Sequence, residues 1–311
     1  MPRRVSIIIP CHNAEPWLAQ ALESALAQTW PEIEVIVIDD GSRDGSAAVA
    51  LRYASRGVRV AAQPNLGASA ARNHGLRLAG GDFIQFLDAD DLLAPEKIAR
   101  QMGAAAALPG AAHCGTWSRF RLSPADADFT PQMLCRDAEP VEWVAAKLGH
   151  NAMMHPASWL VSRALADRAG PWDESLSLDD DGEYFTRIVL SSEGVRCSSD
   201  AVSYYRSGLR ESLSGSKSDR AWESAFRSLE LSATRLLAAE DSARTRRACA
   251  TAYQQFIYDS YPGAAACRGK ASARVALLGG SDLRPAGGAR FRLARRLIGW
   301  RLAKRLSSLF R

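Results

Sequence analysis

Three short polar clusters interrupt the apolar runs in the first third of the chain, and their side chains are of types that bind phosphate esters and metal ions. Pro10-Cys11-His12-Asn13 follows the run VSIII, Asp39-Asp40-Gly41-Ser42 follows EVIVI, and Asp88-Ala89-Asp90-Asp91 follows FIQFL. Each cluster starts where a buried strand would end, which is where open α/β sheets bind their ligands. The spacing therefore predicts one nucleotide crevice built from the ends of several strands.

The carboxylates of this crevice predict a divalent cation, because acidic side chains repel a diphosphate unless Mg²⁺ or Mn²⁺ bridges the two. Asp88 and Asp90 lie two residues apart and point the same way in an extended segment, so one can accept from ribose hydroxyls while the other reaches the metal. The alternative is an Asp-rich turn that caps a helix starting near Pro95. Neither GxGxxG after the first strand nor GxxxxGKS/T occurs, which removes the main support for dinucleotide-binding and P-loop folds.

Alternating strands and helices must position these residues. Continuous β-branched runs at 5–9 and 34–39 are typical of parallel strands buried on both faces, and weaker strands are expected at 58–62 and 82–88. Helices are expected between them, at 15–28, 44–56 and 67–79. The βαβαβαβ order predicts an α/β fold, and right-handed crossovers then bring all three clusters to the carboxyl edge of a parallel sheet.

The segments VSIIIPCHNAE, QTWPEIEVIVIDDGSRDGS and NLGASAARNHGLRLAGGDFIQFLDADD resemble the N-terminal half of family 2 glycosyltransferases. The similarity is dense over residues 5–100, weaker to about 215 and absent beyond. It implies the GT-A fold, a Rossmann-like, mostly parallel mixed sheet flanked by helices, and a metal-dependent enzyme that uses a nucleotide sugar, expected to be a UDP-sugar. The resemblance assigns Pro10 and His12 to the base pocket with Asn13 beside them, Asp40 to the uracil edge, Arg72 to the base or diphosphate, Asp88 to the ribose, and Asp90 to Mg²⁺ or Mn²⁺.

Several of these positions have a plainer interpretation. His12 stands where the family often has Tyr, so a loop histidine with satisfied hydrogen bonds is an equal alternative. Asp44 is better interpreted as a helix N-cap than as a ligand. Asn65 and Gly67 are expected to form a turn and a helix entry first, and ligand contacts second. Arg72 lies near that helix start, where amides and a cation favour an anion.

A second acidic segment supplies a candidate catalytic base, which glycosyl transfer needs in order to take the proton of the acceptor hydroxyl. GPWDESLSLDDDGEYFTRI, residues 170–188, resembles the family segment in which an acidic pair opens a helix that ends in Arg. Alignment on Arg187 places the pair at Asp180 and Asp181. We assign Asp181 as the base with Asp180 in support, and the alternative is a shift of one residue. Asp179 is expected only to complement the helix dipole. The resemblance implies a single displacement with inversion.

Two other functions share parts of this pattern. A sugar-nucleotide nucleotidyltransferase has a similar architecture, but it usually needs a Gly-rich loop with a basic residue where this chain has PCHNAE. A non-catalytic sugar-nucleotide-binding module would lack a second acidic site, and the acids at 179–181 argue against it. We therefore expect a glycosyltransferase of the EC 2.4 class that acts on a glycan or lipid-linked acceptor in cell-envelope polysaccharide synthesis.

Composition limits the class of protein further. The chain has 311 residues and 47% hydrophobic content, enough for one large domain or two modest ones. It has no run of 18 uncharged apolar residues and no signal-peptide pattern, so we expect a cytoplasmic protein. Six cysteines occur without a CxxC pair or a His cluster, which predicts reduced, mostly buried thiols and argues against structural zinc or disulfides.

We divide the chain into a glycosyltransferase domain at 1–215, a helical appendage at 216–283 and a basic tail at 284–311. The domain comprises a nucleotide-sugar half at 1–100 and an acceptor half at 101–215. The acceptor half contains aromatic, His and Asn residues suited to a sugar-binding wall, namely His113, Trp117, Trp143, His150, Asn151, His155 and Trp159. A Ser/Gly-rich stretch after 206, with Arg206 and Arg210, is expected to form a loop over the diphosphate. The frequent YRxH of the family is YRSG here, which excludes a His there.

The tail carries nine Lys or Arg and no acid, while the net charge of the whole chain is +5, so the remainder carries about −4. A basic tail on a mildly acidic body argues against a nucleic-acid-binding core. Arg interleaved with Leu, Ile, Trp and Phe over 289–311 predicts a helix lying on an anionic bilayer, at the inner face of the membrane, with imperfect amphipathicity. A partner-binding or disordered tail is the alternative.

Overall fold

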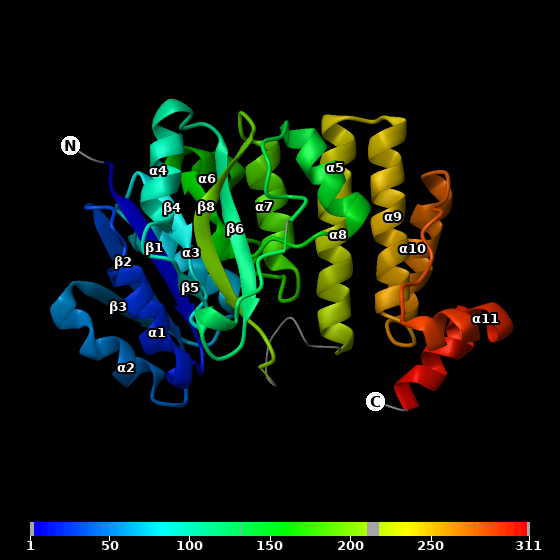
Figure 1. The fold of residues 1–311 in the computed structure, drawn as a ribbon, viewed down its shortest axis with the longest axis horizontal. Coiled ribbons are helices and arrows are strands. Elements are labelled where there is room, and N and C mark those ends of the chain that lie inside the picture. Colours follow the sequence, from blue (N-terminus) through cyan, green and yellow to red (C-terminus); the bar gives the residue numbers. More distant parts are fainter. Residues whose placement is uncertain (1–2, 131, 210–217, 310–311) are drawn as a thin grey trace.

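A computed structural model describes residues 3–130, 132–209 and 218–309. Its centre is an eight-stranded mixed sheet with strand order β3-β2-β1-β4-β7-β6-β8-β5 (Figure 1). The strands are β1 Val5–Cys11, β2 Ile33–Asp40, β3 Val58–Gln63, β4 Phe83–Phe86, β5 Leu92–Leu93, β6 Ala112–Phe120, β7 Trp159–Ser162 and β8 Val195–Arg206. β1 to β4 are mutually parallel, as is the β6–β8 pair, whereas β7 and β5 run antiparallel to their neighbours. The predicted mixed, mostly parallel α/β sheet is confirmed.

Helices cover both faces of the sheet. In the first half these are α1 Glu15–Leu26, α2 Ser46–Arg52, α3 Ala68–Leu78 and α4 Lys97–Ala107. In the second half they are α5 Pro140–His150, α6 Arg163–Ala169 and α7 Asp180–Leu190, followed by α8 Asp219–Ala239, α9 Ala243–Asp259, α10 Ala265–Leu277 and α11 Ala289–Leu309. The expected helices and strands of residues 5–88 are present with shifts of a few residues at their ends.

The continuous apolar runs of the central strands follow from burial on both sides. Ile7 and Ile9 share a buried cluster with Leu18 and Leu22 of α1, whereas Ile8 points into a separate cluster on the other face. Ile38 of β2 likewise contacts Ala71 of α3 on that second face. Because successive side chains of a strand point to opposite faces, every position must be apolar when both faces are covered.

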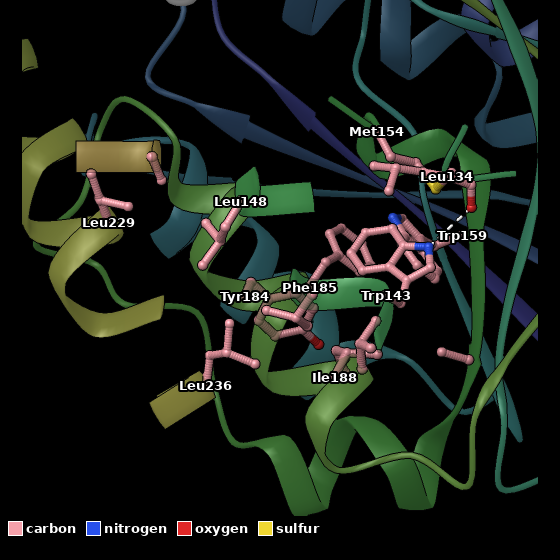
Figure 2. Close-up of a cluster of buried hydrophobic side chains, with 14 of the residues drawn as sticks. Leu134, Trp143, Leu148, Met154, Trp159, Tyr184, Phe185, Ile188, Leu229 and Leu236 are labelled. Carbon is pink, nitrogen blue, oxygen red and sulfur yellow. Dashed lines mark hydrogen bonds between the residues drawn. The ribbon is translucent and has the colours of Figure 1, made fainter. Parts of the chain in front are cut away.

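A second core lies between the sheet and the C-terminal helices. Trp143 of α5 and Trp159 of β7 meet at 5.2 Å between ring centroids, and Trp159 stacks on Phe185 of α7 at 5.1 Å. Leu229 and Leu236 of α8 belong to the same cluster (Figure 2). The helices expected as an appendage at 216–283 therefore complete the hydrophobic core of the second half. Figure 1 shows α8 and α9 side by side beyond α7.

The basic tail forms α11 at the end of the molecule opposite the N-terminus (Figure 1). Its helix is interrupted at Gly299, whose φ of 75° lies in the left-handed region. Beyond the interruption, Trp300 packs against Tyr258 and Tyr261 at centroid distances of 4.9 and 5.0 Å. Within the described ranges, no helix combines the length and the apolar character that crossing a bilayer would require.

Candidate active site

Hydrogen bonds join the loops that follow β1 and β2. The backbone N–H of Asn13 donates to Ser42 Oγ at 3.0 Å, and the N–H of Arg43 donates to Asn13 Oδ1 at 2.8 Å. Asn13 itself adopts a left-handed conformation with φ of 49°, which Asn tolerates better than most residues. Asp44 accepts from the N–H groups of Ser46 and Glu15, both at 3.0 Å, so it serves the first residues of two helices.

Asp40 holds the loop that leads into α3. One carboxylate oxygen accepts from Gln63 Nε2 and from the N–H of Leu66, both at 2.8 Å, and the other accepts from the N–H of Gly67 at 2.8 Å. The next residue, Gly41, has a φ of 67°, and a Cβ there would lie 2.8 Å from the backbone nitrogen of Asn65. Asp40 is thus buried and already bonded to backbone amides near the start of α3.

His12 lies above this loop and is exposed. Its Nδ1 lies 2.8 Å from the carbonyl oxygen of Asp40, and its Nε2 lies 3.2 Å from the side-chain amide nitrogens of Asn13 and Asn65. A carbonyl can only accept and an amide nitrogen can only donate, so this arrangement assigns the proton to Nδ1 of a neutral imidazole. The sequence interpretation of a satisfied loop histidine matches these contacts.

Arg72 of α3 joins the two acidic segments. Its Nη2 donates to Asp88 and its Nη1 donates to Asp180, each at 2.8 Å. The guanidinium is buried and lies 4.4 Å above the ring of Trp172. Burial alone would lower the pKa of Arg72, but the carboxylates of Asp88 and Asp180 raise it above its ordinary range.

The start of α3 was expected to bind an anion, and in this structure the carboxylate of Asp180 lies there. Ser69 Oγ donates to Asp180 at 2.9 Å, beside the Arg72 contact. Arg72, predicted to favour an anion at this helix start, and its neighbour Ser69 thus both bind the second acidic segment, far away in sequence. Arg72 also contacts Asp88, the residue predicted to bind the ribose.

The acidic turn after β4 is compact and brings the carboxyl groups of Asp88, Asp90 and Asp91 close together. The N–H of Asp91 donates to the carbonyl of Asp88 at 3.0 Å, which closes the turn. Burial, followed by the charges of Asp91 and Asp88, raises the pKa of Asp90 to about 8. Arg206 of β8 partly balances this charge, because its Nε donates to the carbonyl of Asp90 and its backbone N–H donates to Asp91 Oδ1, both at 2.8 Å.

This turn fits a divalent cation by its donor chemistry. Mg²⁺ and Mn²⁺ take carboxylate oxygens, and carboxylates that raise one another's pKa are stabilised in their charged form by a cation between them. Arg206 does not take the place of such a cation. Its guanidinium packs against the rings of Trp17 and Phe120, 4.5 and 4.3 Å from their centroids. Asp90 with Asp88 is the pair that would hold the metal.

Behind the turn, Asp91, His155 and Ser203 form a buried chain of hydrogen bonds, here called the relay, which the sequence did not predict. Asp91 Oδ2 lies 3.0 Å from His155 Nδ1, and His155 Nε2 lies 3.0 Å from Ser203 Oγ. Burial lowers the pKa of His155 to about 3, so the imidazole is neutral and donates to Asp91 from Nδ1. All three residues are buried, and the relay fastens the acidic turn to β8. The third acid of DADD was its only sequence signal.

The second acidic segment opens α7, as its alignment predicts. Asp179 is the N-cap with φ of 63°, and Ser228 of α8 donates to its carboxylate at 2.6 Å. Asp180 accepts from Arg72, Ser69 and the N–H of Asp181, whereas Asp181 accepts at 2.9 Å from the N–H of Gly182. Burial, then the charges of Asp180 and Asp179, raises the pKa of Asp181 to about 7.

Residues 6–154 match the model of glycosyl transferase family 2. A glycosyltransferase of Escherichia coli, YibD, is 44% identical over 94 residues, covering 30% of this chain and 27% of that protein. A Rickettsia typhi glycosyltransferase is 30% identical over 198 residues, covering 60% of this chain and 59% of that protein. Both are described as uncharacterised. The chain carries a family 2 glycosyltransferase domain. The alignments span less than two thirds of these relatives' own lengths.

Solved structures extend the likeness of this family 2 domain to the whole fold. Staphylococcus aureus TarS 1-349 in complex with UDP-GlcNAc matches with a TM-score of 0.73 at 18% identity, covering 99% of this chain and 92% of that one. The mannosyltransferase PcManGT from Pyrobaculum calidifontis, in complex with GDP-Man and Mn²⁺, matches with a TM-score of 0.56 at 18% identity, covering 99% and 88%. The GT-A fold is therefore confirmed.

The sugar-binding wall expected in the second half of the family 2 domain is largely wrong. Trp143, Trp159, His113 and His155 are at most 1% exposed and Trp117 is also buried, so a sugar cannot reach them. Burial of the large apolar rings stabilises the core by about 1.5–3 kcal/mol for each of them. His150 and Asn151 stay exposed at the end of α5.

The Ser/Gly-rich stretch after β8 divides between described and undescribed residues. Arg206 is described and is bonded to the acidic turn, as shown above. Arg210 and the rest of the stretch to 216 lie outside the described residues. The expected loop over a diphosphate stays a prediction.

Proposed function

We propose that this family 2 domain transfers a sugar from a nucleoside diphosphate donor to an acceptor hydroxyl, with a divalent cation and with inversion. One observation carries the proposal. Arg72 holds Asp88 of the predicted donor site and Asp180 of the predicted base segment, each at 2.8 Å. The two acidic segments therefore border one site, as a single displacement between donor and acceptor requires.

The donor that we propose is a UDP-sugar bound at the carboxyl edge of β1, β2 and β4. Pro10, His12, Asn13 and Asp40 would face the nucleobase, and Asp88 would accept from ribose hydroxyls. The likeness of fold to TarS in complex with UDP-GlcNAc and to PcManGT in complex with GDP-Man and Mn²⁺ supports a sugar nucleotide and a divalent ion. When bound at Asp90 and Asp88, Mg²⁺ or Mn²⁺ would neutralise the charge of the leaving diphosphate.

The contacts favour Asp181 over Asp180 as the base. Asp180 already accepts from Arg72, Ser69 and its neighbour's N–H, so its lone pairs are taken by strong donors. The carboxylate of Asp181 accepts only from the N–H of Gly182 within the described residues, and its pKa is raised to about 7, the range in which a carboxylate accepts protons well. The acceptor proton moves to Asp181, the acceptor oxygen bonds the anomeric carbon, and the nucleoside diphosphate leaves from the opposite face.

We further propose that α11 carries the enzyme to an anionic membrane surface, which suits a lipid-linked acceptor. Leu293 and Leu297 are 61% and 75% exposed among basic residues of the same helix. Trp300 belongs to the segment predicted to contact the membrane, but its ring packs against Tyr258 and Tyr261. The proposed membrane contact therefore depends on the exposed leucines and arginines and not on this Trp.

A thermal-shift screen tests the donor assignment. UDP, GDP and their common sugar derivatives are added with and without Mn²⁺, and binding to the native state should raise its stability by about 2.7 kcal/mol at a hundredfold excess over Kd. Asp90→Asn should lose the Mn²⁺-dependent part. Asp200→Asn, at an exposed acid that pairs with Arg100, is the matched control. No stabilisation by any nucleoside diphosphate would reject the proposal.

A further inference from the structure

Three cysteines that are scattered in the sequence meet in the second half of the molecule. The Sγ atoms of Cys114, Cys135 and Cys197 all lie within 4.8 Å of one another. Cys114 of β6 is fully buried, while the other two are partly exposed. Cys114 and Cys197 are register partners on the parallel strands β6 and β8, and Cys135 comes from the segment before α5. The sequence predicted reduced, mostly buried thiols, but it did not predict that three of them would meet.

The segment that carries Cys135 is fastened on both sides of it. The carbonyl of Leu134 accepts from Trp143 Nε1 at 3.0 Å, drawn as a dashed line in Figure 2. On the other side, Asp137 Oδ1 accepts from the N–H of Cys197 at 2.8 Å, and Ala138 forms a bridge with Val195. These contacts hold the third thiol against the strand pair, so the cluster follows from the fold.

We propose that this cluster binds a zinc ion through three thiolates. Thiolate is a preferred ligand of Zn²⁺, with Zn–S distances of about 2.3 Å, which place tetrahedral sulfurs about 3.8 Å apart. Sulfurs within 4.8 Å of one another reach that spacing by small side-chain rotations. The fourth ligand is a water or the exposed carboxylate of Asp137. The site differs in chemistry from the oxygen-only turn at Asp90, so the two select different ions.

A disulfide accounts for the cluster less well than a metal. One disulfide joins only two of the three sulfurs, whereas one metal ion uses all of them.

Zinc at this position would support the acceptor half. Cys135 precedes α5, which starts at Pro140 and carries Lys147. Lys147 Nζ donates at 3.1 Å to the carbonyl of Gly182 in the first turn of α7, next to the proposed base Asp181. Closing the loop between β6 and α5 with a metal therefore stabilises the element that supports α7.

Metal analysis of the reduced full-length chain tests this site directly. We expect one zinc per chain after dialysis, and a thiolate-to-cobalt charge-transfer absorption when Co²⁺ is added to the zinc-free wild-type protein. Cys135→Ser should abolish both signals, whereas Cys267→Ser, at a buried cysteine of α10, should retain them. The Co²⁺ spectrum uses the unmutated chain, so it is informative even where the variant fails to fold.

Three results would overturn the zinc site. The first is reduced wild-type protein that binds neither Zn²⁺ nor Co²⁺. The second is equal loss of metal in Cys267→Ser and Cys135→Ser. The third is a disulfide between two of these cysteines, found by mass spectrometry in protein that also lacks metal. Because Mn²⁺ does not compete for thiolates, none of these results depends on the proposed glycosyl transfer.

Discussion

The two halves of the molecule build their parts of the candidate site in different ways. In the nucleotide half, Asp40 ends the buried strand β2, Asn13 lies just after β1, and both are held by backbone amides of neighbouring loops. In the acceptor half, Asp180 and Asp181 start a helix whose place depends on packing against α8 and on the salt bridge to Arg72. A site at strand ends is positioned by local pairing, whereas a site at the start of a packed helix is positioned by the core.

The largest expected effect concerns the chemistry of the acceptor half. Asp181→Asn should lower the transfer rate by about 10²- to 10⁴-fold, because an amide cannot take the acceptor proton. The thermal shift with the donor should stay unchanged. Asp179→Asn, two residues earlier, is the matched control, since its amide can still accept from Ser228. Wild-type transfer by Asp181→Asn would disprove the base assignment.

The connection between the halves comes next. Arg72→Met leaves the partly buried carboxylates of Asp88 and Asp180 without their cation, which should cost about 1.5–3 kcal/mol in the free energy of unfolding by urea. Arg77→Met, at an exposed arginine of the same helix, should change it by no more than about 0.5 kcal/mol. Equal costs for the two variants would show that the Arg72 bridge does not hold the halves together.

The pH dependence of transfer separates the two acidic segments. Asp181 must be deprotonated to act, and its pKa is raised to about 7. The transfer rate should therefore fall as the pH drops through 7, by about tenfold per pH unit below it. Rates at saturating donor and Mn²⁺ across pH 5 to 9 give the profile. A flat profile down to pH 5 argues that another group is the base.

The acidic turn of the nucleotide half should destabilise the metal-free fold. The raised pKa of Asp90, about 8, means that the folded state holds a proton that the unfolded state releases near its ordinary pKa. Stability from this group is therefore present at low pH and is lost as the pH rises toward 8. Asp90→Asn should raise the Tm at pH 8 by about 2–4 °C without metal. A lower Tm of Asp90→Asn at pH 8 would show that the Asp90 carboxylate does not destabilise the metal-free fold.

The smallest effect concerns the tail, which lies outside both halves. Vesicles that contain phosphatidylserine should bind the wild-type chain, as measured by co-sedimentation. Arg292→Gln should weaken this binding by about 1 kcal/mol. Arg220→Gln on α8 is the control, because it removes the same charge away from the tail. Equal binding of both variants would separate membrane contact from α11.

Much of the nucleotide half was predictable, since apolar runs of β-branched residues indicate buried strands and polar residues at their ends follow from the alternation. The relay from Asp91 through His155 to Ser203 was not, because nothing in the sequence pairs residues of three different elements. The prediction of a sugar-binding wall of aromatic residues in the acceptor half was wrong for a related reason. Trp143 and Trp159 have the same composition signal whether they bind a sugar or fill a core, and only packing separates the two.

By itself, the sequence determined the order of strands and helices in residues 5–88, the family of the domain and the two acidic segments, because these depend on local periodicity and short motifs. Tertiary structure decided which groups meet. It placed Asp88 and Asp180 on one arginine, buried the aromatic residues, joined α8 to the core, and gathered Cys114, Cys135 and Cys197 into one cluster. These contacts join positions far apart in the chain, and long-range packing selects them with no fixed spacing that a sequence could reveal.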